Sequence, residues 1–279
     1  MISVNRVGRG VRYFISLVVK LLIIFIVAYP FFWVVFTAFK PYKETITNPP
    51  GFIPKIWTLE GMRQCLSSLD IWHFMKNSLI VSLSVLIGQY LIIIPAAYAF
   101  ARCKFVGKNI LFGIVLLGFM IPQQVTFIPT YLLFSKQKML QSFWPQILPF
   151  LANAFGIFLL RQYFMQIPEE IIESARLDNA SELKIITHIM IPMGKTAVVT
   201  IGLLSFISQW NSYFWPLIMT TKDKFRPLTI AVASLKTVDG AVIWNELMSA
   251  NLFLIGPILL AYFLGNKQIQ KAFVYSGIK

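Results

Sequence analysis

The sequence predicts an all-α integral membrane protein with six transmembrane helices in a single domain that covers residues 1–279. Hydrophobic residues make up 57% of the chain and charged residues only 13%. The mean hydropathy of +0.70 is far higher than that of a soluble enzyme. A helix needs about 20 apolar residues to cross the hydrocarbon of a bilayer. Six stretches meet this requirement: 14–39, 75–100, 109–134, 143–164, 192–220 and 247–265.

The first apolar stretch follows a basic segment with Arg6, Arg9 and Arg12. It continues to Phe39 without a small-residue cleavage site, which favours an uncleaved span over a signal peptide. Placing the N-terminus in the cytoplasm leaves a small excess of the 25 basic residues inside. The short loop 102–108 is basic and lacks acids, as expected of a cytoplasmic loop. Both termini are therefore predicted to be cytoplasmic.

The first external loop, residues 40–70, predicts two kinds of local structure. Asn48-Pro49-Pro50-Gly51 indicates an extended segment, and residues 57–69 are typical of a short amphipathic piece at the membrane interface. Cys65 lies in this loop and Cys103 in a cytoplasmic loop, so we expect no disulfide between them.

Several kinds of chemistry are missing from the sequence. No Asp, Glu, Lys, Arg or His lies near the centre of a predicted span, which disfavours a proton relay and favours an ATP-hydrolysing partner. The two histidines have no nucleophile or metal-ligand pattern around them, so we assign no catalytic residue and no metal ligand. The net charge of +14 is scattered along the chain, which favours contact with anionic lipid headgroups over nucleic acid. Gly194-Lys195-Thr196 lacks the earlier glycine of a phosphate-binding loop and predicts a helix start.

Neutral polar residues do enter the predicted spans. Amides and hydroxyls can hydrogen-bond a polyhydroxylated solute, and aromatic rings can stack on a sugar. The alternative is that the polar groups bond neighbouring helices and the rings form an interfacial belt. The candidate pathway residues are Gln123, Gln124, Gln209, Trp210, Asn211 and Tyr213; other polar residues in the spans are Ser82, Ser84, Gln89, Asn153, Ser205, Ser208, Ser212 and Asn251.

The segment 168–192 is an acidic stretch between apolar runs. It holds five of the eleven acidic residues of the chain: Glu169, Glu170, Glu173, Asp178 and Glu182. Such a concentration of acids in one loop of a membrane protein predicts a docking surface.

Local sequence in this segment predicts a helix, a turn and a second helix. Pro168 suits the first helical position, and Ile171, Ile172 and Ala175 give that helix an apolar side. Asp178 and Asn179 tolerate the left-handed backbone of a sharp turn. Ser181 is the predicted N-cap of the second helix.

The same segment resembles the signature loop of permease subunits in bacterial binding-protein-dependent ABC importers. Its motif is Glu-Ala-Ala, three residues, Gly, nine residues, Ile, one residue, Leu-Pro. Four residues match outright, Ser174 and Ile191 replace Ala and Leu, and Asn179 stands where the family has Gly. The matching residues are Glu173, Ala175, Ile189 and Pro192, and Asp178 and Ala180 fit the extended motif of carbohydrate importers. Further segments that resemble the smaller permease of maltose-type systems are 77–82, 95–102, 121–122, 128–129, 158–162 and 210–211.

The resemblance implies partners and a role. It implies a cytoplasmic coupling loop at about residues 166–192, between spans four and five. It also implies a homologous second permease, two ATP-binding subunits that hold ATP and Mg²⁺, and an extracytoplasmic solute-binding protein. The chain itself would bind no cofactor, hydrolyse nothing and lie in the cytoplasmic membrane of a bacterium. The implied solute is a carbohydrate, with an oligosaccharide as the favoured form.

Alternatives remain open for the solute and for the class of protein. Importers of glycerol 3-phosphate or of a glycerol phosphodiester share this loop, although a phosphorylated solute favours a cation on the pathway and no span of this chain has one near its centre. A solitary channel, a secondary carrier or a membrane enzyme acting on lipid-linked sugar would leave the acidic loop unexplained.

Overall fold

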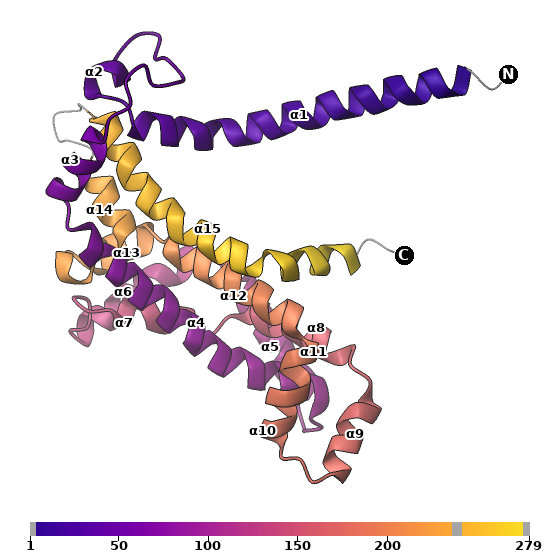
Figure 1. The fold of residues 1–279 in the computed structure, drawn as a ribbon. Helices are drawn as coiled ribbons and strands as arrows, with labels where there is room; N and C mark the ends of the chain where they lie inside the picture. Colours follow the sequence, from indigo (N-terminus) through magenta and orange to yellow (C-terminus); the bar gives the residue numbers. More distant parts are fainter. Residues whose placement is uncertain (1–3, 236–241, 276–279) are drawn as a thin grey trace. The chain divides into compact units, whose positions relative to one another are not determined.

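The computed structural model describes residues 4–235 and 242–275, and side chains within 12–235 and 242–266. Every regular element in the described part is a helix (Figure 1). The chain forms two compact units, which are described separately below. Unit 1 comprises Met1–Ile71 with Val232–Ile255, and unit 2 comprises Trp72–Ala231 with Gly256–Lys279. The single permease domain remains a prediction.

Unit 1 contains a long first helix and a loop that folds back onto its end. The helices are α1 (Val4–Ala38), α2 (Tyr42–Thr45), α3 (Glu60–Ser68) and the beginning of α15 (Trp244–Tyr275). Tyr29 stacks on Phe52 with 4.8 Å between ring centroids. The amide of Thr58 donates to the carbonyl of Phe39 at 2.9 Å. Apolar rings and one backbone hydrogen bond thus hold the loop 40–70 against α1.

Helix α3 packs against the beginning of α15. A Cβ atom at position 61 would lie 2.5 Å from the backbone oxygen of Asn245. Only glycine therefore lets α3 come this close to α15. Cys65 is fully buried, and burial followed by the charge of Glu246 raises the pKa of its thiol to about 11. Helix α3 lies inside the predicted amphipathic piece 57–69. Cys65 and Cys103 are both free thiols.

Unit 2 is a helical bundle in which several spans are broken. Buried side chains of α4, α8 and α12, including Ile93, Leu160 and Ile201, form much of its core. Helix α4 contacts α12 closely, because Tyr90 donates to the carbonyl of Val198 at 2.8 Å. The helices outside the acidic loop are α4 (Ile71–Arg102), α5 (Lys108–Met120), α6 (Gln123–Lys136), α7 (Trp144–Ile147), η1 (Leu148–Phe150), α8 (Ala154–Met165), α12 (Lys195–Trp210), α13 (Phe214–Met219), η3 (Asp223–Phe225) and α14 (Leu228–Ser234), the last of which extends into unit 1.

Four helices of the described chain are long and apolar enough to cross a membrane, and the number rises to six if each of two bent pairs is one span. The four are Arg12–Ala38, Ile71–Arg102, Trp144–Met165 and Trp244–Asn266. These fall on the predicted spans 14–39, 75–100, 143–164 and 247–265.

The other two predicted spans are interrupted. The stretch 109–134 consists of α5 and α6, which meet at 93°. Pro122 precedes α6 with an extended backbone, because proline lacks the N–H that a continuous helix needs. The stretch 192–220 is also broken, since α12 ends at Trp210 and α13 begins at Phe214. Helix α12 begins at Lys195, which confirms the predicted helix start, and meets the preceding helical segment at 83°.

Candidate functional site

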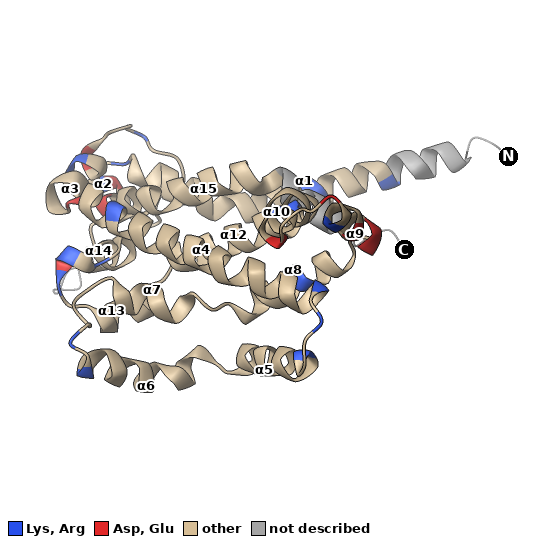
Figure 2. Cartoon of the chain, turned by 90° about the horizontal axis from the view of Figure 1, so that it is seen from below, with Lys and Arg blue, Asp and Glu red and all other residues tan. Residues whose placement is uncertain are grey.

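The acidic loop forms two short helices at one end of unit 2, away from α13 (Figures 1 and 2). Helix α9 spans Glu169–Leu177 and α10 spans Glu182–Ile185. Pro168 was predicted at the first helical position but precedes α9, because its ψ of 138° is extended. Asn179 has a φ of 53°, as the turn prediction requires. The hydroxyl of Ser181 accepts from the amide of Lys184 at 3.4 Å, which confirms the predicted N-cap.

Apolar side chains fix the base of this loop. Ile172 of α9, Ile185 of α10 and Met190 are fully buried. They join the core cluster that contains Phe164. The predicted apolar side of α9 is confirmed at Ile172 and Ala175, whereas Ile171 is 36% exposed. A π-helical segment, Ile186–Met190, and α11 (Ile191–Met193) connect the loop to α12. Because the loop shares the bundle core, a force on the loop reaches the spans.

Arg102 at the end of α4 ties the loop to the bundle by polar contacts. Its guanidinium donates to the carboxylate of Glu169 and to the carbonyl of Phe164, each at 2.6 Å, and also to the carbonyl of Ile167. The side chain of Arg102 is only 7% exposed. This charged group therefore satisfies carbonyls at the end of α8 as well as the first acid of α9.

A second polar cluster joins the two helices of the loop. Arg176 of α9 pairs with Glu182 of α10 at 3.1 Å, and the hydroxyl of Tyr98 donates to the same carboxylate. The hydrogen bond to Glu182 raises the pKa of the Arg176 guanidinium above its ordinary value. Three elements, α4, α9 and α10, thus hold one another in place.

The outer surface of the loop combines acids with unpartnered leucines. Glu173, Ser174 and Asp178 are exposed. Leu177 is 83% exposed and Leu183 is 71% exposed. These leucines were not among the predicted site residues. Leu177 follows Ile172 by five positions and so lies on a different face of α9. This helical spacing was a signal that the Leu177 side chain would point outward.

Three of the four remaining motif residues are half-buried. Ala175 and Ala180 are half-buried against the core, and the amide of Ala180 donates to the carbonyl of Ala175 at 3.0 Å. Ile189 is half-buried in the π-helical segment, whereas Pro192 is exposed in α11. The small residues therefore close the turn.

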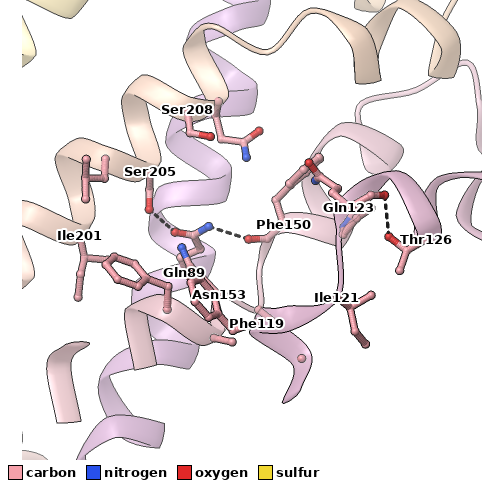
Figure 3. A pocket seen from close by; sticks show the side chains of 17 residues that line it. Gln89, Phe119, Ile121, Gln123, Thr126, Phe150, Asn153, Ile201, Ser205 and Ser208 are labelled. Carbon is pink, nitrogen blue, oxygen red and sulfur yellow. Dashed lines mark hydrogen bonds between the residues drawn. The ribbon is translucent and has the colours of Figure 1, made fainter. Parts of the chain in front are cut away.

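A cavity of about 640 Å³ lies in unit 2 beside the break between α5 and α6 (Figure 3). It is lined by the junction of α5 and α6, the stretch that leads into α8, and one side of α12. None of its 17 lining residues is charged. The polar lining residues are Gln89, Gln123, Thr126, Asn153, Ser205, Ser208 and Gln209.

Gln89 of α4 joins three elements at this cavity. Its amide donates to the carbonyl of Phe150 at 2.7 Å and its oxygen accepts from the hydroxyl of Ser205 at 2.5 Å (Figure 3). The side chain is buried, with 4% of the residue exposed. Gln89 thus supports the cavity wall while presenting a neutral polar surface.

Four of the six predicted pathway residues line a cavity and two do not. Gln123 and Gln209 line the large cavity. Gln124 and Tyr213 line a neighbouring cavity of about 450 Å³, which shares Gln123 and Gln209 with the first. The other two line neither cavity. Trp210 is fully buried and stacks on Phe206, and Asn211 caps the end of α12.

The predicted pathway residues omitted five polar residues of the cavity, one of which, Thr126, was not noted in the sequence at all. Gln89, Asn153, Ser205 and Ser208 were recognised as polar residues in the spans, but periodicity could not separate them from residues that bond other helices. In the described residues, no group of three or more His, Cys, Asp or Glu could hold a metal ion.

Comparison with known proteins gives the family. Residues 93–275 match the model of the binding-protein-dependent transport system inner membrane component. The sn-glycerol-3-phosphate transport system permease protein UgpE of Salmonella choleraesuis (strain SC-B67) is 30% identical over 277 residues, which cover 95% of both chains. UgpE of Escherichia coli O1:K1 / APEC is 30% identical over 260 residues, which cover 89% of this chain and 90% of the relative.

Two solved structures share the fold. A bacterial ABC transporter involved in the import of the acidic polysaccharide alginate has a TM-score of 0.83 at 21% identity, covering 94% of this chain and 98% of the other. The alginate transporter in complex with alginate pentasaccharide-bound periplasmic protein has a TM-score of 0.65 at 16% identity, covering 96% and 97%. The chain therefore belongs to the family of binding-protein-dependent transport system inner membrane components and is a multi-pass permease subunit of an ABC importer.

Proposed function

We propose that this permease moves a carbohydrate, with an oligosaccharide as the favoured solute, into the cell and is driven by ATP hydrolysis on separate subunits. The observation that carries the role is the α9–α10 loop, whose base is in the core while its acids and leucines face outward. In the complete importer we place a second homologous permease, two ATP-binding subunits with ATP and Mg²⁺, and an extracytoplasmic solute-binding protein. This chain would hydrolyse nothing.

The coupling mechanism is mechanical. The outer surface of residues 173–180 would sit in a groove of an ATP-binding subunit. Closure of the ATP-binding subunits would then move α9, and the buried Ile172 and Arg102 contacts would transmit that movement to α8 and α4. Switching the spans between inward-facing and outward-facing states needs such a rigid connection. The proposal has the loop and both termini in the cytoplasm.

The proposed solute class rests on the lining of the large cavity. Amides and hydroxyls can hydrogen-bond sugar hydroxyls, and Phe119, Phe150 and Phe155 in the wall offer faces for sugar rings. No charged side chain lines the cavity, which disfavours an intrinsic phosphate site. The transporter whose structure shares this fold at a TM-score of 0.83 is involved in the import of the acidic polysaccharide alginate, which supports a carbohydrate but not the absence of charge on it.

Glycerol 3-phosphate, or a glycerol phosphodiester, is the second candidate. It is favoured by the similarity to UgpE along nearly the whole chain. In that case the second permease would supply the cation that neutralises the phosphate.

The assembly is tested by affinity isolation of the tagged full-length chain from native membranes in mild detergent, with mass spectrometry of the co-purifying proteins. We expect an ATP-binding subunit and a second permease. A chain that purifies alone, even after crosslinking, would support a channel or carrier instead. With the assembly in hand, solute-stimulated ATP hydrolysis in proteoliposomes compares oligosaccharides with glycerol 3-phosphate.

Two loop variants test the docking surface in the same assay. Asp178→Lys reverses an exposed charge, and Ala175→Trp adds bulk at the turn. Both should abolish solute-stimulated ATP hydrolysis while membrane insertion is retained. Normal coupling in both variants would refute the assignment of this loop.

A further inference from the structure

Unit 1 contains a cavity of about 310 Å³ whose lining includes none of the proposed coupling or pathway residues. It lies between the end of α1, the loop that follows α2, and the first residue of α15. Its walls are two tryptophans, two threonines, a proline and a lysine: Trp33, Trp244, Thr37, Thr45, Pro50 and Lys40. All six residues belong to unit 1.

Lys40 is unusual because it is buried without a carboxylate partner. It is 1% exposed, and among the described residues no carboxylate oxygen lies within 4.0 Å of its ammonium group. The ammonium donates to the carbonyl of Gly51 and lies 5.2 Å from the centroid of the Trp33 ring. Burial lowers the pKa of Lys40, and the charge of Glu44 opposes this in part. A buried ammonium needs compensation, and one carbonyl and one ring leave donor capacity unused.

Thr37 supplies a second unsatisfied group in the same wall. It is 5% exposed, and its hydroxyl has no hydrogen-bond partner in the described part of the chain. It lies three residues before Lys40, near the end of α1, and both residues line the cavity. Leaving a buried hydroxyl without a partner costs free energy, which a ligand in the cavity would recover. The two residues therefore form a pair of donors around an open space.

The position of the cavity indicates which ligand can reach it. The apolar span Arg12–Ala38 ends two residues before Lys40, so the cavity lies at the boundary between hydrocarbon and water. Tryptophan side chains such as Trp33 and Trp244 concentrate at this level of a membrane. Phosphate groups of lipids lie at the same level, and phosphate is a ligand for which an ammonium and a hydroxyl are suitable donors.

We propose that this cavity is a phosphate-binding site in which Lys40 pairs with a phosphate oxygen and Thr37 donates a hydrogen bond to it. The tryptophans pack against the apolar part of the phosphate ester. The phosphate can belong to an anionic lipid headgroup or to a soluble phosphate ester, since both present the same chemistry to the two donors. The site is separate from the coupling loop and the solute cavity, so it does not depend on the proposed solute.

The test uses the full-length chain in its purified membrane complex. Native mass spectrometry counts retained phosphatidylglycerol in titrations against phosphatidylcholine, and a thermal-shift titration measures binding of inorganic phosphate and of glycerol 3-phosphate. Lys40→Met removes the charge and keeps the apolar stem. Thr37→Val removes only a hydroxyl without a described partner, so this variant should fold even if Lys40→Met does not. Lys43→Met is the matched control, because Lys43 is exposed in the same loop.

Each outcome has a defined meaning. Preferential retention of phosphatidylglycerol that falls about tenfold in Lys40→Met and detectably in Thr37→Val, but not in Lys43→Met, supports the site with lipid as its source. Binding of inorganic phosphate or glycerol 3-phosphate with the same dependence, without lipid preference, supports the site with a soluble source. Equal binding of every probe by the wild type, Lys40→Met and Thr37→Val would overturn the proposal.

Discussion

The α9–α10 loop and the large cavity of unit 2 use polar chemistry in opposite ways. The loop combines exposed acids with the ion pairs Arg102–Glu169 and Arg176–Glu182. The cavity has no charged lining residue, and its central amide, Gln89, is engaged within the protein. A charged, firmly anchored surface suits a protein partner that exerts force. A neutral lining suits a solute that must enter and leave, because tight binding would prevent release.

The largest expected effect is at the outer surface of the loop. Leu177→Asp should weaken binding of the ATP-binding subunit about thirtyfold, because burying an exposed leucine side chain against a partner contributes about 2 kcal/mol that aspartate would lose. The fold should be unaffected, since the side chain is 83% exposed. Titration of purified ATP-binding subunit against the permease complex measures the affinity.

The matched control is Val106→Asp. Val106 is fully exposed in the loop between α4 and α5, so the change in polarity is the same at a different surface. Equal loss of affinity in both variants would show that an acid at any exposed apolar position weakens binding. The α9 surface would then not be the specific contact for the ATP-binding subunit.

The anchor of the loop should have the next largest effect. Arg102→Met removes the side-chain donor from the carbonyls of Phe164 and Ile167, although Phe164 keeps the backbone amide of Ile167 at 3.3 Å, and should lower the free energy of unfolding by about 1–3 kcal/mol. Thermal unfolding followed by circular dichroism measures this change. Lys104→Met, at an exposed residue of the next loop, should leave the unfolding temperature unchanged. Equal stability of the two variants would contradict the role of Arg102.

The hydrogen bond inside the cavity should contribute less. A double-mutant cycle with Gln89→Leu and Ser205→Ala should give a coupling free energy of about 0.6 kcal/mol, because hydrogen bonds between membrane helices are weak on average. The quantity is measured by unfolding in mixed detergent. A coupling of zero would mean that the 2.5 Å contact between these residues does not stabilise the bundle.

The smallest effect is expected at the turn of the loop. Asn179→Gly should change stability by less than about 1 kcal/mol, because glycine relieves the positive φ of 53° but loses more chain entropy on folding. Asn179→Val places a β-branched side chain in the same backbone region and should be clearly less stable. Transport by the Asn179→Gly variant should match the wild type. Loss of coupling in that variant would assign the amide of Asn179 a direct role.

The loop was more predictable from sequence than the cavity, for physical reasons. The turn at Asn179, the N-cap at Ser181 and the buried Ile172 follow from local rules that act over a few residues. The exposed leucines were missed because the acids are the stronger local signal in this segment.

The cavity depends on contacts between residues far apart in the chain. Gln89 meets Ser205 across 116 positions, and no local pattern specifies that pairing. Local sequence patterns also failed to specify where the predicted spans break. The stretch 109–134 was predicted as one span because it is apolar throughout, whereas α5 and α6 meet at 93° on either side of Pro122. Trp210 was selected as a sugar-stacking residue, whereas it is fully buried against Phe206.

The most direct test of the account replaces Leu177 with a photo-reactive amino acid and irradiates native membranes. The account predicts a crosslink to an ATP-binding subunit, identified by mass spectrometry, whose yield changes when ATP is added. A reactive group at position 177 that crosslinks only to lipid, or to no protein at all, would contradict the central claim that this surface of α9 couples the permease to ATP hydrolysis.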